Sequence, residues 1–407
     1  MLSQNLNSTF KPEPLSASTA AGVDALREYL ERIGFHQLYK YIASSSLYGS
    51  LPSAINHASA PNVAEFFATV LADYAGLELA QCLMIGHPFR SADLSPSDRE
   101  TADKLVAAGV LAVDGERLAP TNLQLINAFG VDLLIDRRIN FPCGSLHDVY
   151  IGIDSYLMLY YINSGEIERD HRALDLCTGS GIAALYASLY CDDVIATDVG
   201  LIPLRLVQMN RQLNDKSSNV AVRNQPLDET LDGSTKVNLL TCNPPFVAFP
   251  PGVNTTLYSH GTDIDGLGYL RTIIDRLPNV LLPKGSAYLV ADLVGDNVGP
   301  HFVKELQERA LKGRFSVDVY IDGVLTAEDQ VPAFTAHLAS ANPDRDRKEL
   351  REELRAFQRD ILKADKYYLS TIRVQMDIRP GEVRVFRRHS ISPVLKYESW
   401  PEILLAK

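Results

Sequence analysis

A stiff polar turn carries the most specific chemistry in this sequence. The apolar run Val237–Cys242 reads as a buried strand and leads directly into Asn243-Pro244-Pro245-Phe246. Each proline fixes φ and removes a backbone donor, so the main-chain carbonyls of the turn are free to accept hydrogen bonds from a ligand. The side-chain carbonyl of Asn243 adds another acceptor. Two rigid acceptors are complementary to an NH₂ group and can turn the nitrogen lone pair out of conjugation.

The predicted acceptor site consists of this turn and of two polar side chains that follow it. The ring of Phe246 can lie against a planar acceptor or near a positive charge that develops on its nitrogen. Ligands bind at the carboxyl ends of strands in open α/β sheets, which favours a binding role over a simple turn. The predicted catalytic residues are Asn243, Pro244 and Phe246, and the predicted substrate-binding residues are Pro245, Tyr258 and His260.

A glycine-rich loop precedes the turn in the chain. The segment Leu174–Ile182 reads as an apolar strand whose end opens a helix. Glycine lets the backbone approach a ligand closely, and a helix N-terminus offers unpaired N–H groups. The spacing Gly179-x-Gly181-x-x-Ala184 fits a dinucleotide fingerprint, with Asp198 about 20 residues on to hold ribose hydroxyls. The loop alone leaves NAD and S-adenosylmethionine (SAM) as alternatives.

Two features favour SAM over NAD. Asp175 lies inside the first strand, where a carboxylate suits a ligand with a cationic amino group. A pyrophosphate at the helix N-terminus does not need such a carboxylate. The second feature is the Asn-Pro-Pro turn, which suits a nitrogen that receives a methyl group.

The combination of DLCTGSG and NPPF resembles the class I SAM-dependent methyltransferases with an N/D-P-P-Y/F motif. These include enzymes that methylate release-factor glutamine and enzymes that methylate exocyclic amines of adenine or guanine in nucleic acid. The resemblance covers residues 150–294. A narrower likeness, to bacterial two-domain methyltransferases of largely unassigned substrate, extends to IGIDSYL and to YSHGTDIDGLGYLRTIIDRLP. That likeness implies an architecture and names no acceptor.

The resemblance also implies roles for individual residues. The methionine part of SAM would be surrounded by the glycine-rich loop, its ribose would bind Asp198, and the segment Asp154-Ser155-Tyr156 would cover it from the other side. The third-strand motif reads RNQPLDE, which leaves Gln225 and Asp228 as alternatives for the adenine contact. The predicted cofactor-binding residues are Asp175, Cys177, Thr178, Gly179, Gly181, Asp198, Asn243 and Tyr156. Cys177 replaces the usual first glycine, which is tolerable if its φ is negative.

The pattern of apolar segments predicts an α/β fold with a doubly wound, Rossmann-like methyltransferase sheet over residues 146–407. Short apolar strands alternate there with helices, as in RALDLC, GIAALYASLY, DVIATD, LRLVQMNRQL and VNLLTC. Two more strands are expected at 285–294 and 315–320. Near the C-terminus we expect a charged helix over 344–366 and then a hairpin of YYLSTIRVQM and EVRVF around Pro380-Gly381.

The front of the chain is predicted to be a loose tail over 1–20 and a mainly helical domain over 21–145 with a role in substrate recognition. Ser95 as N-cap, Pro96 and Gly109 predict a helix over 96–108. A hairpin at Asp114-Gly115 follows, and this order resembles a winged helix. Because the helix carries more acidic than basic residues, its charge disfavours DNA reading.

The composition limits the partners. A net charge of −11 and a pI near 5.3 oppose attraction to nucleic-acid phosphates. Five scattered cysteines without a CxxC pair, and nine histidines without HxH or HExxH spacing, predict neither disulfides nor a metal site. Without a long apolar run or a signal peptide, the chain is expected in the cytoplasm and away from membranes.

The sequence thus favours a SAM-dependent N-methyltransferase that acts on a planar nitrogen, amide or amine, of a protein or small-molecule acceptor. An alternative is an rRNA or tRNA base N-methyltransferase, favoured by the family and disfavoured by the charge. A minor alternative is an NAD-dependent oxidoreductase, which the glycine-rich loop alone permits.

Overall fold

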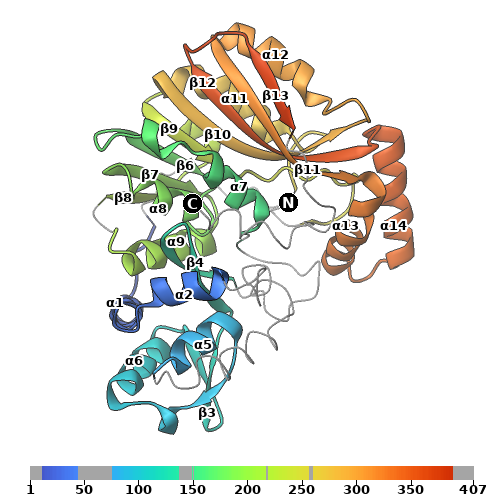
Figure 1. The fold of residues 1–407 in the computed structure, drawn as a ribbon. Coiled ribbons are helices and arrows are strands. Elements are labelled where there is room, and N and C mark those ends of the chain that lie inside the picture. The colour runs from blue at the N-terminus through green and yellow to red at the C-terminus, as the bar shows by residue number, and fades with distance from the viewer. Residues whose placement is uncertain are drawn as a thin grey trace.

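The structure is a computed structural model that describes residues 12–44, 76–136, 149, 151–216, 219–255 and 260–387. Figure 1 shows a small front domain, coloured blue to cyan, below a large sheet domain coloured green to red. Within the described part of the chain, no helix is long and apolar enough to cross a membrane.

An eight-stranded sheet forms the centre of the large domain, with the strand order β13-β11-β12-β10-β9-β6-β7-β8. The run β10-β9-β6-β7-β8 within this order is parallel throughout. Strand β12 runs antiparallel to both of its neighbours, β10 and β11. The strand order reverses between β6 and β9. The strands are β6 (Arg172–Leu176), β7 (Asp193–Asp198), β8 (Val220–Asn224), β9 (Val237–Cys242), β10 (Leu281–Gly295), β11 (Phe315–Thr326), β12 (Lys366–Met376) and β13 (Val383–Arg387).

Helices cover both faces of the sheet because successive strand residues point to opposite sides. On β6, Ala173 packs into a core with α7, α8 and α9, whereas Leu174 packs into a second core with α11 and α12. The predicted doubly wound sheet is therefore confirmed. The helices are α7 (Ile153–Tyr161), α8 (Ile182–Ala187), α9 (Leu201–Leu213), α10 (Leu227–Thr230), α11 (Gly268–Val280), α12 (Phe302–Gly313), α13 (Ala327–Ala341) and α14 (Arg347–Ala356).

The C-terminal hairpin prediction is wrong. Strands β12 and β13 form where expected, but β13 pairs with β11 in parallel, with Val317 opposite Val383. The reason is that β10 and β11 already occupy both edges of β12, so the free ladder groups lie on the outer edge of β11. The charged helix also ends early, because α14 passes into a π-helical turn (Phe357–Ile361) before β12 begins.

The front domain contains the predicted helix and hairpin. Helix α6 (Pro96–Ala107) begins at Ser95, whose hydroxyl accepts from the backbone N–H of Asp98 at 3.2 Å. Strands β2 (Leu111–Asp114) and β3 (Arg117–Pro120) form the hairpin, and β1 (Phe89–Arg90) adds a third strand beside β3. The other α-helices in the described part of this domain are α1 (Ala17–Arg32), α2 (Phe35–Ser44) and α5 (Glu78–Ile85). Because α1 starts at Ala17, the predicted tail over 1–20 is too long at its C-terminal end.

A second hairpin, β4 (Leu123–Ala128) and β5 (Val131–Asp136), lies where a mainly helical pattern was predicted. Its two-residue turn, Phe129-Gly130, has φ values of 54° and 83°, as a type I′ hairpin turn requires. The hairpin joins the domains. On one side Gln124 donates to the Met84 carbonyl of α5, and on the other Asn210 of α9 bonds both backbone groups of Leu134.

Candidate functional site

A cavity of about 500 Å³ opens at the carboxyl ends of β6, β7, β9 and β10. This edge includes the point where the strand order reverses, which is where open α/β sheets bind their ligands. Residue 149, α7, the start of α8, α11, α13 and β12 also contribute side chains to the wall. Among the predicted site residues the cavity is lined by Asp175, Cys177, Thr178, Gly179, Asp198, Asn243, Pro244, Pro245 and Phe246.

Asp175 is buried at the base of the glycine-rich loop and holds it in shape. One carboxylate oxygen accepts from the Thr178 hydroxyl at 2.6 Å and from the Ala184 N–H at 3.2 Å. The other accepts from the Thr241 hydroxyl of β9 at 2.7 Å. Burial raises the pKa of this carboxyl to about 6. Because the protein already donates three hydrogen bonds to this carboxylate, a ligand ammonium could use only an oxygen lone pair that these bonds leave free. The main role of Asp175 in the structure is to support the loop.

Asp198, at the end of β7, ties two loops together. Its carboxylate accepts from the backbone N–H groups of Gly179 at 3.0 Å, Val199 at 2.8 Å and Gly200 at 2.9 Å. Burial raises its pKa in spite of these donors. The side chain lies on the cavity wall, which is the place that its predicted contact with ribose hydroxyls needs.

Cys177 stands where a glycine is usual, and its backbone adopts the conformation that glycine favours. Its φ is +51°, in the left-handed region, so the condition under which the replacement of glycine costs no strain is not met. The chain must leave β6 and reverse into the loop within two residues, and the usual glycine makes this turn without strain. The thiol of Cys177 lines the cavity and interacts with the buried Cys242, whose pKa is raised chiefly by burial.

Two predicted cofactor residues do not line the cavity. Gly181 has a φ of +83°, and a Cβ there would lie 2.3 Å from a methyl carbon of Val207 in α9. The glycine is thus required by the packing of α8 against α9. The ring of Tyr156 packs on Phe129 of the β4–β5 hairpin, with 6.1 Å between the ring centroids. Its neighbours Asp154 and Ser155 line the cavity instead.

Asn243 is oriented by two acceptors on α7. Its amide nitrogen donates to the Asp154 carboxylate and to the Ser155 hydroxyl, both at 3.1 Å. Because an ionised carboxylate can only accept, this contact identifies which end of the amide is nitrogen. The carbonyl oxygen of Asn243 is therefore the end that remains for a ligand. Pro244 and Pro245 continue the same wall of the cavity.

The predicted substrate residues have different outcomes. Pro245 lines the cavity, whereas His260 does not. A ring nitrogen of His260 is hydrogen-bonded to the Thr255 hydroxyl at 2.8 Å, its ring meets Phe249 edge-on, and burial lowers its pKa. Tyr258 lies outside the described residues.

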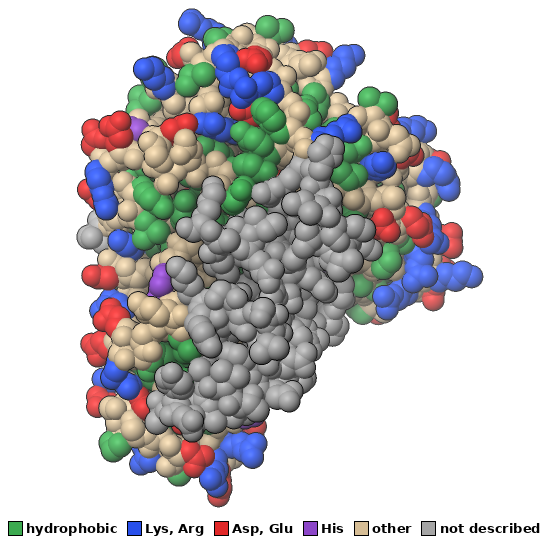
Figure 2. Space-filling view, viewed as in Figure 1, with side chains coloured by type: hydrophobic (Ala, Val, Ile, Leu, Met, Phe, Trp, Pro, Cys, Tyr) green, Lys and Arg blue, Asp and Glu red, His purple; other side chains and the backbone are tan. Residues whose placement is uncertain are grey.

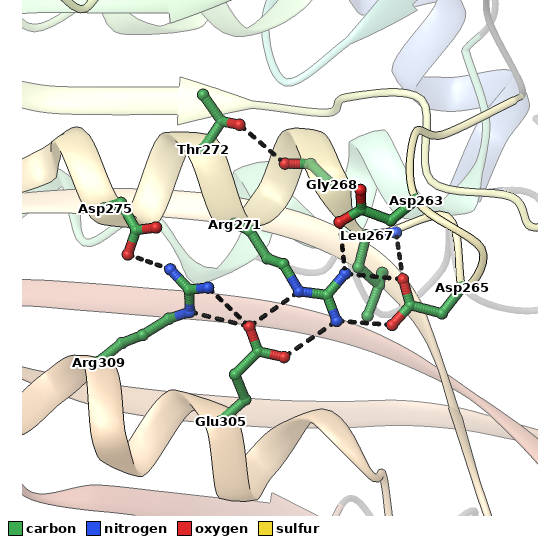
Figure 3. A network of polar contacts seen from close by, with 9 residues as sticks. All are labelled: Asp263, Asp265, Leu267, Gly268, Arg271, Thr272, Asp275, Glu305 and Arg309. Carbon is green, nitrogen blue, oxygen red and sulfur yellow. Dashed lines mark hydrogen bonds and ion pairs between the residues drawn. The ribbon is translucent and has the colours of Figure 1, made fainter.

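The segment after the turn is anchored by a network of charges between α11 and α12 (Figure 3). Arg271 of α11 donates to Asp263 at 3.0 Å, to Asp265 at 2.7 and 2.8 Å, and to Glu305 of α12 at 2.8 and 3.0 Å. The anchored loop presses on the turn, since a Cβ on Gly266 would lie 2.3 Å from the Phe246 carbonyl. The network thus supports the acceptor turn from outside the cavity.

Several lining residues were not identified from the sequence. Asp292 is the only charged residue in the apolar run GSAYLVADLV, and this could have singled it out. No sequence signal marks Gln330 and Phe334 of α13, which reach the cavity from far along the chain. Gln225 and Asp228, the alternatives for the adenine contact, both lie on the wall. The trio Glu168, Asp170 and His171 could hold a metal by its spacing but is not part of the lining, and the absence of a metal stays a prediction.

Part of the chain is similar in sequence to protein glutamine methyltransferases. A ribosomal protein uL3 glutamine methyltransferase of Neisseria gonorrhoeae is 33% identical over 163 residues, which are 38% of this chain and 52% of that protein. The enzyme of the same name from Bradyrhizobium diazoefficiens is 28% identical and covers 38% and 51%. A release factor glutamine methyltransferase of Clostridium acetobutylicum is 25% identical and covers 41% and 59%. The chain spans about half the length of these curated relatives.

No protein-family model matches the chain. Among solved structures, the tRNA m1G37 methyltransferase of M. jannaschii overlaps with a TM-score of 0.36 and 13% identity, over 66% of this chain and 59% of that one. An overlap this weak has no bearing on the acceptor. The relatives confirm the resemblance to class I SAM-dependent methyltransferases, and the large domain has the Rossmann-like fold that the resemblance implied.

Proposed function

We propose that this chain is a SAM-dependent N-methyltransferase that methylates the side-chain amide nitrogen of a glutamine in a protein. The observation that carries this proposal is the orientation of Asn243. Its amide nitrogen is held by Asp154 and Ser155, so its carbonyl oxygen is left to accept from an NH₂ group. The named activities of the relatives, which act on a ribosomal protein and a release factor, support an amide acceptor.

SAM would bind along the glycine-rich loop and supply an electrophilic methyl group. Asp198 accepts hydrogen bonds from the ribose hydroxyls of SAM. The loop held by Asp175 surrounds the methionine part of SAM. The chemistry of the wall fits this ligand, because SAM has a positive sulfonium and ammonium and the described lining contains five aspartates and no lysine, arginine or histidine. The same wall disfavours NAD, whose pyrophosphate is an anion.

On the acceptor side, the chain fixes a nitrogen that is a poor nucleophile. Asn243 Oδ1 and a main-chain carbonyl of the proline turn accept hydrogen bonds from its two N–H groups, which draws the nitrogen lone pair out of conjugation and toward the methyl group. Phe246 lies against the plane of the amide. Because these groups are already in place before the acceptor binds, little reorganisation opposes the reaction.

The alternative acceptors are an RNA base and a small molecule. The acidic lining and the net charge of −11 oppose an RNA backbone near the cavity. A cytoplasmic location also stays a prediction.

Incubating the purified chain with methyl-labelled SAM and fractionated cell extract tests the acceptor class directly. We expect the label in protein, at a glutamine, and resistant to ribonuclease. If ribonuclease releases the label, the acceptor is RNA and the proposal of a protein acceptor is wrong. In parallel, SAM and S-adenosylhomocysteine should raise the melting temperature and NAD should not, since a ligand of the native state stabilises it. Equal stabilisation by NAD would overturn the cofactor assignment.

A further inference from the structure

Asp292 is a cavity side chain to which the mechanism above gives no role. It lies on β10, where Leu289 pairs with Cys242, the last residue of β9. Three residues further along β10, Asp292 is therefore level with the turn that follows β9. Alternate residues of a strand point to the same face of the sheet, so Asp292 points to the side of Tyr288 and Val290. These two residues belong to the core on the α7 side. Asp292 thus stands beside the acceptor turn, on the face from which α7 holds Asn243.

The hydrogen bonds of Asp292 differ from those of Asp154, Asp175 and Asp198 in the wall. Asp175 and Asp198 each accept three hydrogen bonds from the protein, and Asp154 is committed to Asn243 and Ser155. Asp292 accepts one, at Oδ2, from the Gln330 side chain at 3.1 Å. Among the described residues nothing donates to its Oδ1. One oxygen is thus fixed by Gln330, and the other remains available in the cavity.

The proposed reaction leaves a need that Asn243 and the proline turn cannot meet. When the acceptor nitrogen forms its bond to the methyl carbon, the carbon–sulfur bond breaks and its electron pair stays on sulfur. The nitrogen then carries a positive charge and one proton too many. The amide and backbone carbonyls can bind N–H groups but are too weakly basic to take a proton.

We propose that Asp292 is the acceptor-side carboxylate of this site, a catalytic residue that stabilises the positive charge on the acceptor nitrogen and takes the proton that it loses. The N–H bond electrons return to nitrogen, the proton forms an O–H bond at Oδ1, and solvent later removes it. Gln330 is the positioning residue that fixes the carboxylate. This inference rests on the proposed function, because it needs a nitrogen acceptor at the turn.

The surroundings of Asp292 suit it to such a proton transfer. Burial and the nearby Asp154 raise its pKa to about 7. From the elements packed around it, the titratable side chains are Asp154 of α7 and Tyr367 of β12, while α13 contributes the neutral Gln330. A base with a pKa near the working pH is ionised often enough to accept a proton and basic enough to hold it.

The test uses sinefungin, a SAM analogue in which an amine occupies the place of the sulfonium methyl. Its positive charge lies where the charge of the reaction develops, so the ratio of its affinity to that of S-adenosylhomocysteine reports on Asp292. For the unaltered protein we expect this preference to fall as the pH is lowered from 8 to 6. Asp292→Asn should lower the preference at pH 8 by roughly 10-fold, as expected for a charge-assisted hydrogen bond, and abolish its pH dependence.

Glu229→Gln is the matched control, since it removes the same charge from α10 beside the cavity without changing a lining side chain. It should leave the preference for sinefungin unchanged. S-adenosylhomocysteine affinity in each variant confirms that the cofactor site is folded. If both ligands bind and Asp292→Asn retains the full, pH-dependent preference, Asp292 does not face the reacting nitrogen and the inference fails. If neither ligand binds the unaltered protein, the proposed function fails instead.

Discussion

Asn243 shows how single residues of this site are set before any ligand arrives. The side chain could rotate freely on an exposed turn, but Asp154 and Ser155 take its nitrogen and leave its oxygen for the acceptor. Asp175 and Asp198 each accept three hydrogen bonds, and in each set at least one bond holds the glycine-rich loop while another holds a neighbouring segment. Preorganised polar groups of this kind stabilise developing charge without first having to move.

The left-handed conformation of Cys177 leads to a prediction about stability. A side chain at φ +51° is strained, whereas glycine adopts this φ freely. We expect Cys177→Gly to be more stable than Cys177→Ala by about 1 kcal/mol, and both to bind SAM equally. Chemical denaturation of the two variants measures this difference. Equal stabilities would mean that the loop relaxes out of the left-handed region when the thiol is removed.

Asp292 predicts a pH dependence of stability. Its folded pKa of about 7 lies above the ordinary value of 3.8, so its contribution to stability is fully present below pH 4 and is lost as the pH rises through 7. Asp292→Asn should therefore raise the free energy of unfolding at pH 8 by about 2 kcal/mol, with the gain vanishing toward pH 4. Denaturant titrations at both pH values test the sign. A variant less stable at pH 8 would contradict a raised pKa.

Among the elements, α11 and α12 support the acceptor turn through Arg271. Removing this guanidinium leaves three carboxylates without their shared partner, although its side chain is 22% exposed and water moderates the loss. We expect Arg271→Ala to lower the free energy of unfolding by about 2 kcal/mol and to slow methyl transfer more than it weakens SAM binding.

Arg169→Ala is the control for that experiment, because the exposed Arg169–Asp192 pair should contribute little. Denaturation, calorimetry and single-turnover rates on both variants separate the effects. An Arg271→Ala protein that transfers methyl groups at the normal rate would show that the loop around Gly266 does not support the turn.

The elements that local patterns specify were predicted, and those that depend on distant partners were not. Strands β6, β7 and β9 are short apolar runs with polar ends, so their pattern alone identified them. The partner of β13 depends on which strand edge remains free, and no local pattern contains that information. The β4–β5 hairpin was missed because Phe129-Gly130 lacks the usual Asn or Asp before the glycine.

The same distinction applies to the site. The turn at Asn243 and the loop from Asp175 to Gly179 are contiguous motifs, and the cavity contains both. Gly181 was assigned to the cofactor because the motif does not reveal that Val207 packs against it. Gln330 and Phe334 of α13 join the site from far along the chain, where Gln330 bonds Asp292 of β10, and local patterns do not bridge such a separation.

At the scale of the molecule, charge argues against a nucleic-acid partner. Among the described residues on the face drawn in Figure 2, basic and acidic side chains are intermixed and form no continuous basic stripe. With a net charge of −11, we expect weak binding to generic RNA or duplex DNA at physiological salt. Fluorescence anisotropy at several salt concentrations measures this affinity. Tight binding with a steep salt dependence would favour the RNA-methylating alternative.

The most direct test of the central claim compares SAM affinity and methyl transfer in Asn243→Ala. If the carbonyl of Asn243 holds the acceptor nitrogen, this variant should fold normally and bind SAM within a few-fold of the unaltered protein, while methyl transfer to the labelled acceptor falls by roughly 10²- to 10³-fold. Calorimetric SAM titration and single-turnover transfer on one preparation provide both numbers. Near-normal transfer by a folded Asn243→Ala protein would contradict the proposed mechanism.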